Sequence, residues 1–203
     1  MNKPILLLNA PPRAGKDTLA MLLERIDNAF VCSFKQGVDV LADAVLGVAG
    51  IDGNLFKRWY DLDKEKARKE LGGMSCRQFY IHLSESLMKP IFGNDVFGKC
   101  LAKYIAQNVK DHHKYVVVAG VGFEEEVVTL VDSFGRDSLY LVQWTADGCS
   151  YLNDSRKHLD PVLMSHIMLP HNEKCSTVDG WEKWKEQSVK TIERRLKADG
   201  KLP

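Results

Sequence analysis

Residues 5–18, Ile-Leu-Leu-Leu-Asn-Ala-Pro-Pro-Arg-Ala-Gly-Lys-Asp-Thr, decide the fold of this chain. A short apolar run ends in a loop, and the loop leads into a segment with apolar residues at helical spacing, namely Leu19, Leu22, Leu23 and Ile26. A buried strand, a tight loop and a helix in this order place backbone N–H groups and the side chain of Lys16 around an anion. The stretch therefore predicts a phosphate-binding loop, and with it a protein that handles a nucleoside triphosphate.

The loop departs at two positions from the usual pattern, G-x-x-x-x-G-K-[ST]. Ala10 stands at the first glycine and Asp17 at the hydroxyl residue, while Thr18 supplies a hydroxyl one position later. Ala10 can make the turn if its φ is negative. The helix dipole favours a carboxylate at Asp17, which can also reach Mg²⁺ through water. The alternative is a turn that only starts a helix, but the buried strand and the periodic helix on either side favour a phosphate-binding loop.

The composition indicates an ordinary globular enzyme or binding protein. The 203 residues suit one domain, 1–203, and an apolar fraction of 45% can build a sizeable core. A net charge of +1, from 28 basic and 27 acidic residues, argues against a nucleic-acid partner. The five cysteines form no C-x-x-C pair, which is typical of reduced thiols. Because we find no signal peptide and no apolar run of roughly 20 residues, we expect a cytoplasmic protein with no membrane partner.

Short apolar strands alternate with helical segments along the chain. Strands are expected at 4–9, 29–34, 115–118 and 139–144, and helices at 16–28, 38–48, 52–71, 75–90, 95–109, 124–134 and 181–198. This alternation predicts an α/β domain with a mainly parallel sheet flanked by helices. The ligand is expected at the carboxyl ends of the strands, where the loop of residues 10–18 lies. The helix-rich region, approximately 36–112, suits a subdomain that covers a second substrate, and approximately 146–161 is expected to form a lid loop.

Three motifs follow one another along the chain. The first is the loop 13–18, Arg-Ala-Gly-Lys-Asp-Thr. The second, within 74–97, combines a Ser-x-Arg helix start with a later Gly-x-Asp-x-aromatic helix start, and the third is 116–126, Val-Val-Val-Ala-Gly-Val-Gly-Phe-Glu-Glu-Glu. In this order they resemble the phage-type deoxynucleoside monophosphate kinases, a branch of the P-loop kinases. The resemblance covers most of the chain and makes Asp17 an expected variant of the loop.

The resemblance implies a P-loop kinase-like fold that moves the γ-phosphate of ATP to a deoxynucleoside monophosphate with Mg²⁺. It also implies an acceptor-binding role for the helical region 36–112, allows a homodimer, and points to the host cytoplasm if the chain is encoded by a phage. The third motif departs from the family at Gly120 and Gly122, where the family has Asp and Arg. Two alternatives therefore stay open: a P-loop kinase for another small phosphorylated metabolite, and a diverged nucleotide-binding module without activity.

Phosphoryl transfer needs cations around a near-linear array of phosphates. Lys16 is the candidate that bridges the β- and γ-phosphates of ATP, and Arg13 is expected to cross the γ-phosphate unless it is a solvated loop residue. Thr18 and Asp17 are the candidate ligands of the metal. The expected phosphate cradle is the backbone of Ala14, Gly15, Lys16, Asp17 and Thr18.

The acceptor phosphate needs a second cation, and the arginine fork suits it. Arg77 is the first choice, because it begins a helix after a Gly-Gly break and matches the family. A surface ion pair is the alternative interpretation of Arg77. Weaker candidates for the acceptor are Lys35, Arg58 and Arg68, and the aromatic residues Trp59, Tyr60 and Phe79 are candidates to stack on the base or to belong to the core.

The predicted lid carries three basic side chains, Arg156, Lys157 and His158. We expect Arg156 to close over the transferring phosphate, and an ordinary exposed basic loop is the alternative. The acidic run at 124–126 is interpreted as the first turn of a helix, where the dipole favours carboxylates, rather than as a metal site.

Overall fold

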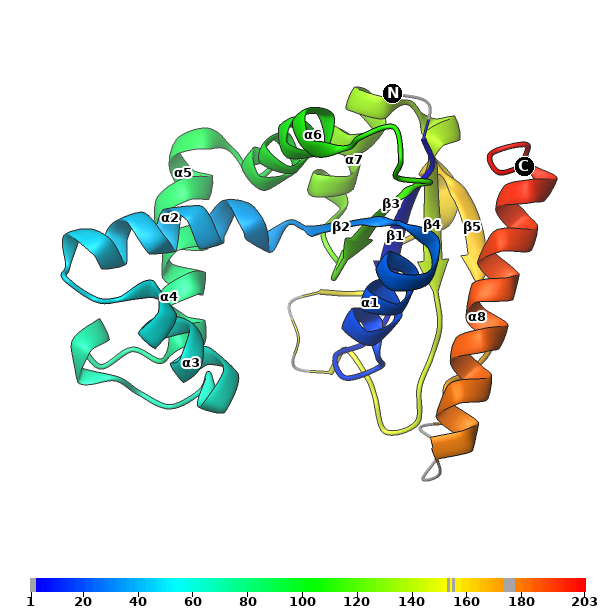
Figure 1. The fold of residues 1–203 in the computed structure, drawn as a ribbon. Coiled ribbons are helices and arrows are strands. Elements are labelled where there is room, and N and C mark those ends of the chain that lie inside the picture. Colours follow the sequence, from blue (N-terminus) through cyan, green and yellow to red (C-terminus); the bar gives the residue numbers. More distant parts are fainter. Residues whose placement is uncertain (1–2, 153, 155, 174–177) are drawn as a thin grey trace.

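The computed structural model describes residues 3–152, 154, 156–173 and 178–203. Its centre is a five-stranded sheet with the order β2-β3-β1-β4-β5, in which every neighbouring pair is parallel. The strands are β1 (Ile5–Asn9), β2 (Phe30–Ser33), β3 (Val116–Ala119), β4 (Leu139–Gln143) and β5 (Ser165–Met168). This sheet, with helices packed on both faces, confirms the α/β class expected from the sequence (Figure 1).

The helices follow the expected order with small shifts at their ends. They are α1 (Lys16–Asp27), α2 (Lys35–Val48), α3 (Gly53–Asp63), α4 (Cys76–Ile81), α5 (Lys89–Phe92), α6 (Val96–Asn108), α7 (Glu124–Phe134) and α8 (Val178–Ala198). A π-helical segment, His82–Met88, joins α4 to α5. None of the helices in the described ranges combines the length and the apolar character that a membrane span needs.

The two faces of the sheet are covered by different helix pairs. On β1, Leu6 and Leu8 pack in one cluster with side chains of α1 and α8, while Ile5 and Leu7 pack in another with side chains of α6 and α7. Successive side chains of a strand point to opposite faces, so a strand that is apolar at every position is buried on both sides. The phosphate loop leaves β1 at the carboxyl edge of this three-layer core.

The helices between β2 and β3 build a third core of their own. Helices α2 to α5 project to one side of the sheet (Figure 1). Their apolar side chains meet in a cluster that includes Val38, Phe56, Phe79, Leu83 and Phe97. The region between 36 and 112 is helical, as expected, and its role in binding an acceptor stays a prediction.

Three local expectations are wrong. The helix expected over 52–71 ends at Asp63, whose carboxylate accepts the backbone N–H of Glu65 at 3.1 Å. The chain then turns back, and the N–H of Arg68 donates to the carbonyl of Met74 at 2.9 Å. The helix expected over 75–90 contains the π-helical segment, which hydrophobic spacing does not reveal. Strand β5 was not expected, because its Ser-His-Ile-Met sequence lacks an apolar run.

Candidate phosphate-binding site

The loop after β1 has the backbone shape of an anion site. Gly15 has a φ of 91° and caps α1, and Arg13 has a φ of 65°, which is uncommon for a residue with a side chain. Ala10 is absent from the described residues with positive φ, so it makes the turn as expected for alanine. Helix α1 begins at Lys16, and the N–H groups of its first turn have no acceptors within the helix. These donors can therefore serve a phosphate.

Trp144, Asn172 and Trp181 contact the phosphate loop and fix its backbone. The indole N–H of Trp144, just after β4, donates to the carbonyl of Ala14 at 2.9 Å, and the Asn172 side-chain amide donates to the same oxygen at 3.2 Å. The Trp181 ring packs on Gly15, because a Cβ at position 15 would lie 2.5 Å from its Cη2 atom. Trp181 stacks on Trp184 with 5.2 Å between ring centroids. Position 15 therefore requires glycine for two reasons: its φ is positive, and the Trp181 ring leaves no room for a Cβ.

Lys16 lies inside the loop. Its Nζ donates to the carbonyls of Ala10 and Pro11 at 2.5 and 2.8 Å, and the residue is only 8% exposed. Burial, followed by the positive charge of Arg156, lowers the pKa of Lys16 to about 8. A buried ammonium close to another cation gains from an anion at this position.

The predicted lid residue Arg156 lies against the strand ends beside the loop. Its Nε and Nη2 donate to Oδ1 and Oδ2 of Asp154 at 2.9 and 2.8 Å, a bidentate pair that lowers the pKa of Asp154 to about 2. The stem of Arg156 fills the space over Gly122, since a Cβ there would lie 2.4 Å from the arginine Cβ and Cγ. Nη1 would lie 3.7 Å from a Cβ at Gly120. The two glycines therefore make room for a guanidinium from another part of the chain.

One buried amide fixes the segment that carries Arg156. Asn9, the last residue of β1, donates from Nδ2 to the carbonyls of Val121 and Lys157, each at 2.9 Å, and to the Tyr151 hydroxyl at 3.1 Å. Its Oδ1 accepts from the Leu159 N–H at 3.0 Å and from Gln143 Nε2 at 2.7 Å. Three of these bonds, to Tyr151, Lys157 and Leu159, join the end of β1 to the segment around Arg156, and the bond from Gln143 joins the ends of β1 and β4.

Arg77, the candidate for the acceptor phosphate, faces this same segment. It lies in the first turn of α4, where Ser75 and Gln78 form a capping box, and its Nη1 contacts Glu65 Oε1 at 3.4 Å. Its positive charge contributes to the low pKa of Asp154, and Arg156 interacts in turn with Lys16. The fold therefore places Arg156 of the lid near Lys16 of the phosphate loop, and Arg77 of the helical region near Asp154, the partner of Arg156.

The other candidates for the acceptor are spread over the helical region. Lys35, at the start of α2, pairs with Asp39 at 3.2 Å and lies over the rings of Tyr60 and Tyr80, 4.2 and 4.5 Å from their centroids. Arg58 is exposed on α3. The guanidinium of Arg68 lies 5.3 Å from the centroid of Trp59, which packs against the third core, and Phe79 is buried in that core. These placements favour a core role for Phe79.

The residues expected to hold Mg²⁺ lie at the end of the loop where α1 begins. Asp17 and Thr18 are both exposed in the first turn of α1. A carboxylate and a hydroxyl are ligands that Mg²⁺ accepts, together with phosphate oxygens and waters. The described residues contain no group of three or more His, Cys, Asp or Glu side chains placed to hold a metal by themselves. Asp17 and Thr18 therefore suit a metal ion that is bound jointly with the phosphates of a nucleotide.

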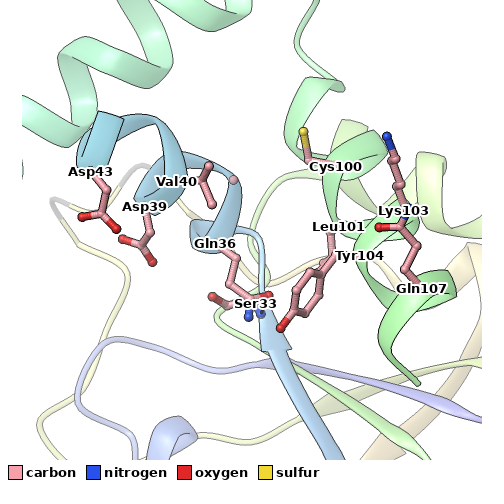
Figure 2. Close-up of a pocket in the computed structure, with 11 residues that line it drawn as sticks. Ser33, Gln36, Asp39, Val40, Asp43, Cys100, Leu101, Lys103, Tyr104 and Gln107 are labelled. Carbon is pink, nitrogen blue, oxygen red and sulfur yellow. Dashed lines mark hydrogen bonds between the residues drawn. The ribbon is translucent and has the colours of Figure 1, made fainter. Parts of the chain in front are cut away.

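A cavity of about 600 Å³ lies between α2 and α6, away from these cations. Figure 2 shows Ser33 and Gln36, at the end of β2 and the start of α2, beside Tyr104 of α6. Lys16, Arg77 and Arg156 do not line it. Size alone does not select this cavity, because a second one of about 610 Å³, lined by Lys35, Tyr60 and Tyr80 among others, is as large, and the three cations line neither.

The sequence did not identify Asn9, Gln143 and Asp154 as site residues. Asn9 and Gln143 each end a buried strand at the carboxyl edge of the sheet. A polar residue that closes an apolar strand is a usable signal for this edge. Asp154 carries no such signal, because its role depends on the path of an irregular segment.

Comparison with known proteins adds one distant likeness. No family model and no curated protein matches this sequence. Among solved structures, the shikimate kinase of Aquifex aeolicus is 15% identical, with an alignment that covers 94% of this chain and 82% of that protein at a TM-score of 0.29. We draw nothing from a likeness at that TM-score, so the fold class rests on the sheet itself.

Proposed function

We propose that the protein transfers the γ-phosphate of ATP to a deoxynucleoside monophosphate, with Mg²⁺. The observation that carries this proposal is the proximity of Arg156 to Lys16 of the phosphate loop, and of Arg77 to Asp154, which holds Arg156. Cations from the loop, the lid and the helical region suit a ligand with several phosphates in a row.

The geometry supports a division of roles. Lys16 and the loop backbone would hold the β- and γ-phosphates of ATP, with Arg13 beside them, and Asp17 and Thr18 would face the metal. Mg²⁺ supplies charge neutralisation on the phosphate oxygens. Arg156 would stabilise the charge on the transferring group, since Asp154 fixes its guanidinium in one orientation. Arg77 would bind the acceptor phosphate from the other side.

The position of Arg156 favours an enzyme over an inactive nucleotide-binding module. An inactive nucleotide-binding module remained an alternative because this chain has Gly120 and Gly122 where the family has Asp and Arg. The stem of Arg156 lies over Gly122, and its guanidinium lies near Gly120. A cation at this place compensates for the arginine that position 122 lacks.

The test is diphosphate formation from Mg-ATP and a panel of deoxynucleoside and nucleoside monophosphates. We expect turnover with at least one acceptor and its loss in Lys16→Ala. Lys183→Ala, at an exposed position of α8, is the matched control and should keep full activity. A wild-type protein that forms no diphosphate from any nucleotide would refute the proposal. Its ATP affinity would then separate a metabolite kinase or binding module from a protein that binds no nucleotide.

A further inference from the structure

A cavity of about 170 Å³ lies beside Gly120, the glycine next to the Arg156 guanidinium. We call it the Glu126 cavity. Through Gly120 it is adjacent to the guanidinium that we assign to the transferring phosphate. Its chemistry is set by three rings, Phe34, Phe97 and Phe123, and four charged groups, Lys35, Glu85, Lys89 and Glu126.

Glu126 is an unusual residue for the wall of a cavity. It is only 5% exposed, and within the described ranges no hydrogen bond or ion pair to its carboxylate is found. Burial raises its pKa to about 7, against the opposing effect of Lys89. The carboxylate oxygens of Glu126 are not among the buried polar atoms that lack a partner in the described residues, and Glu126 lines the cavity, so a ligand there could contact them. A ligand with hydrogen-bond donors would pair with these oxygens.

Two backbone features bring the polar groups to this cavity. Gly98 lets α6 and α7 approach closely, since a Cβ there would lie 2.9 Å from the carbonyl oxygen of Glu126. The π-helical segment contributes Ser84 and Glu85 to the wall. π-Helical turns are rare and occur frequently at functional sites.

The walls match a flat ring with a polar edge. A dry cavity of roughly 150 Å³ takes up a benzene ring, so the available volume suits a ring system. Phe123 offers its ring, with the Lys89 ammonium 4.7 Å from its centroid, and Lys89 also pairs with Glu85 at 2.8 Å. A carboxylate accepts two adjacent N–H donors, and an ammonium beside it donates to a neighbouring carbonyl.

We propose that the Glu126 cavity holds the base of the acceptor and selects a base with two adjacent N–H donors next to a carbonyl. Guanine presents this arrangement, because its ring N–H lies between its amino group and its carbonyl. Cytosine, adenine and thymine do not, since each has an acceptor or a C–H where the carboxylate needs a second donor. Glu126 would accept from both donors and Lys89 would donate to the carbonyl. The inference rests on the proposed function, because it assumes a nucleotide acceptor.

The test compares dissociation constants of dGMP, dAMP, dCMP and dTMP by isothermal titration calorimetry at pH 8, where Glu126 is mostly ionised. The wild type should bind dGMP most tightly. Glu126→Gln should weaken dGMP binding by about tenfold or more, the range of a lost bidentate base contact, and change the other three much less. Glu125→Gln removes the same charge one residue earlier at an exposed position, and should leave all four constants unchanged.

A second variant guards against a folding defect in the first. Lys89→Met keeps the apolar stem but removes the ammonium, so it should also weaken dGMP selectively. If the variants lost affinity equally for all four nucleotides, or if neither variant lost affinity for dGMP, the inference would be overturned. Because binding is measured without turnover, the result is independent of the kinase assay. An active kinase with unchanged base preference in Glu126→Gln would refute only the base pocket, whereas an inactive wild type that binds dGMP through Glu126 would refute only the proposed activity.

Discussion

The charge state of Lys16 depends on what the phosphate loop binds. In the structure its ammonium binds two loop carbonyls, and burial together with Arg156 lowers its pKa to about 8. A triphosphate beside it would favour the charged form and raise that pKa again. The loop lysine is therefore a reporter of phosphate binding as well as a candidate for catalysis.

We predict that ATP binding at pH 8 takes up about half a proton per protein molecule, since half of the Lys16 side chains are neutral at their pKa. Calorimetry in two buffers with different ionisation enthalpies measures this uptake. Lys16→Arg is the control, because a guanidinium stays charged at this pH and should bind without uptake. Wild-type binding with an unchanged proton count would contradict the role of Lys16.

Asn9 is a positioning residue, and its removal should affect the lid more than the loop. Asn9→Leu leaves the Leu159 N–H and the Gln143 amide without their partner, so we expect a loss of about 2 to 4 kcal/mol in the free energy of unfolding. The Leu159 amide should exchange its hydrogen faster, and kcat should fall while the ATP dissociation constant changes little.

The matched control for this change is Asn108→Leu on α6, because Asn108 makes a single local bond to the carbonyl of Tyr104 at 2.9 Å. Asn108→Leu should lower the free energy of unfolding far less than Asn9→Leu and leave kcat unchanged. If Asn9→Leu weakened ATP binding as strongly as it lowered kcat, the amide would support the loop rather than the segment around Arg156.

At the scale of elements, the first turn of α4 determines the position of Arg77. The Ser75 hydroxyl accepts the N–H of Gln78 at 3.2 Å, and the Gln78 side chain accepts the N–H of Ser75 at 2.8 Å. This capping box fixes the first turn of the helix, and Arg77 is part of that turn. The cap therefore orients the arginine that we assign to the acceptor phosphate.

We predict that Ser75→Ala lowers the free energy of unfolding by about 1 kcal/mol and raises the KM of the acceptor while the KM of ATP stays unchanged. Urea unfolding and steady-state kinetics measure the two effects. Ser133→Ala, on an exposed turn of α7, should change neither. A parallel rise in both KM values would show that the cap acts on the whole site instead of on Arg77.

The elements also show which features the sequence can predict. Strand β1, the loop and α1 were predicted because burial on both faces and helical periodicity leave clear patterns. Strand β5 was missed because a short edge strand with Ser and His has no such pattern. The end of α3 at Asp63 depends on the chain pairing back onto 74–75, a contact distant enough to leave no local signal. Asp154 bonds locally to Tyr151 and Arg156, but its segment is irregular and therefore has no periodic pattern.

At the scale of the molecule, two separately packed parts meet at the proposed site. The sheet and its helices carry the phosphate loop, whereas the third core carries Arg77 on α4. Arg156 interacts with Lys16, and its partner Asp154 interacts with Arg77. A ligand that contacts both parts must therefore stabilise each against unfolding, and it must also fix their arrangement.

We predict that a deoxynucleoside linked to adenosine through a polyphosphate chain stabilises the protein more than ATP alone. At a concentration of 100 times its dissociation constant the linked nucleotide adds about 2.7 kcal/mol and raises Tm by about 5 to 10 °C, and ATP at that same concentration should add less because it binds more weakly. The reason is geometric, because one phosphate chain would reach Lys16, Arg156 and Arg77 together. Differential scanning fluorimetry measures the shift.

Two variants make this measurement specific for the junction between the two parts. Arg77→Ala should reduce the shift given by the linked nucleotide to that of ATP alone, because the acceptor half loses its cation. Arg194→Ala, at an exposed position of α8, removes the same charge far from the junction in sequence and should keep the full shift. A linked nucleotide that stabilises the wild type no more than ATP would argue against a nucleotide acceptor. It would favour a kinase whose second substrate has another chemistry, since the ATP half of the site would still be intact.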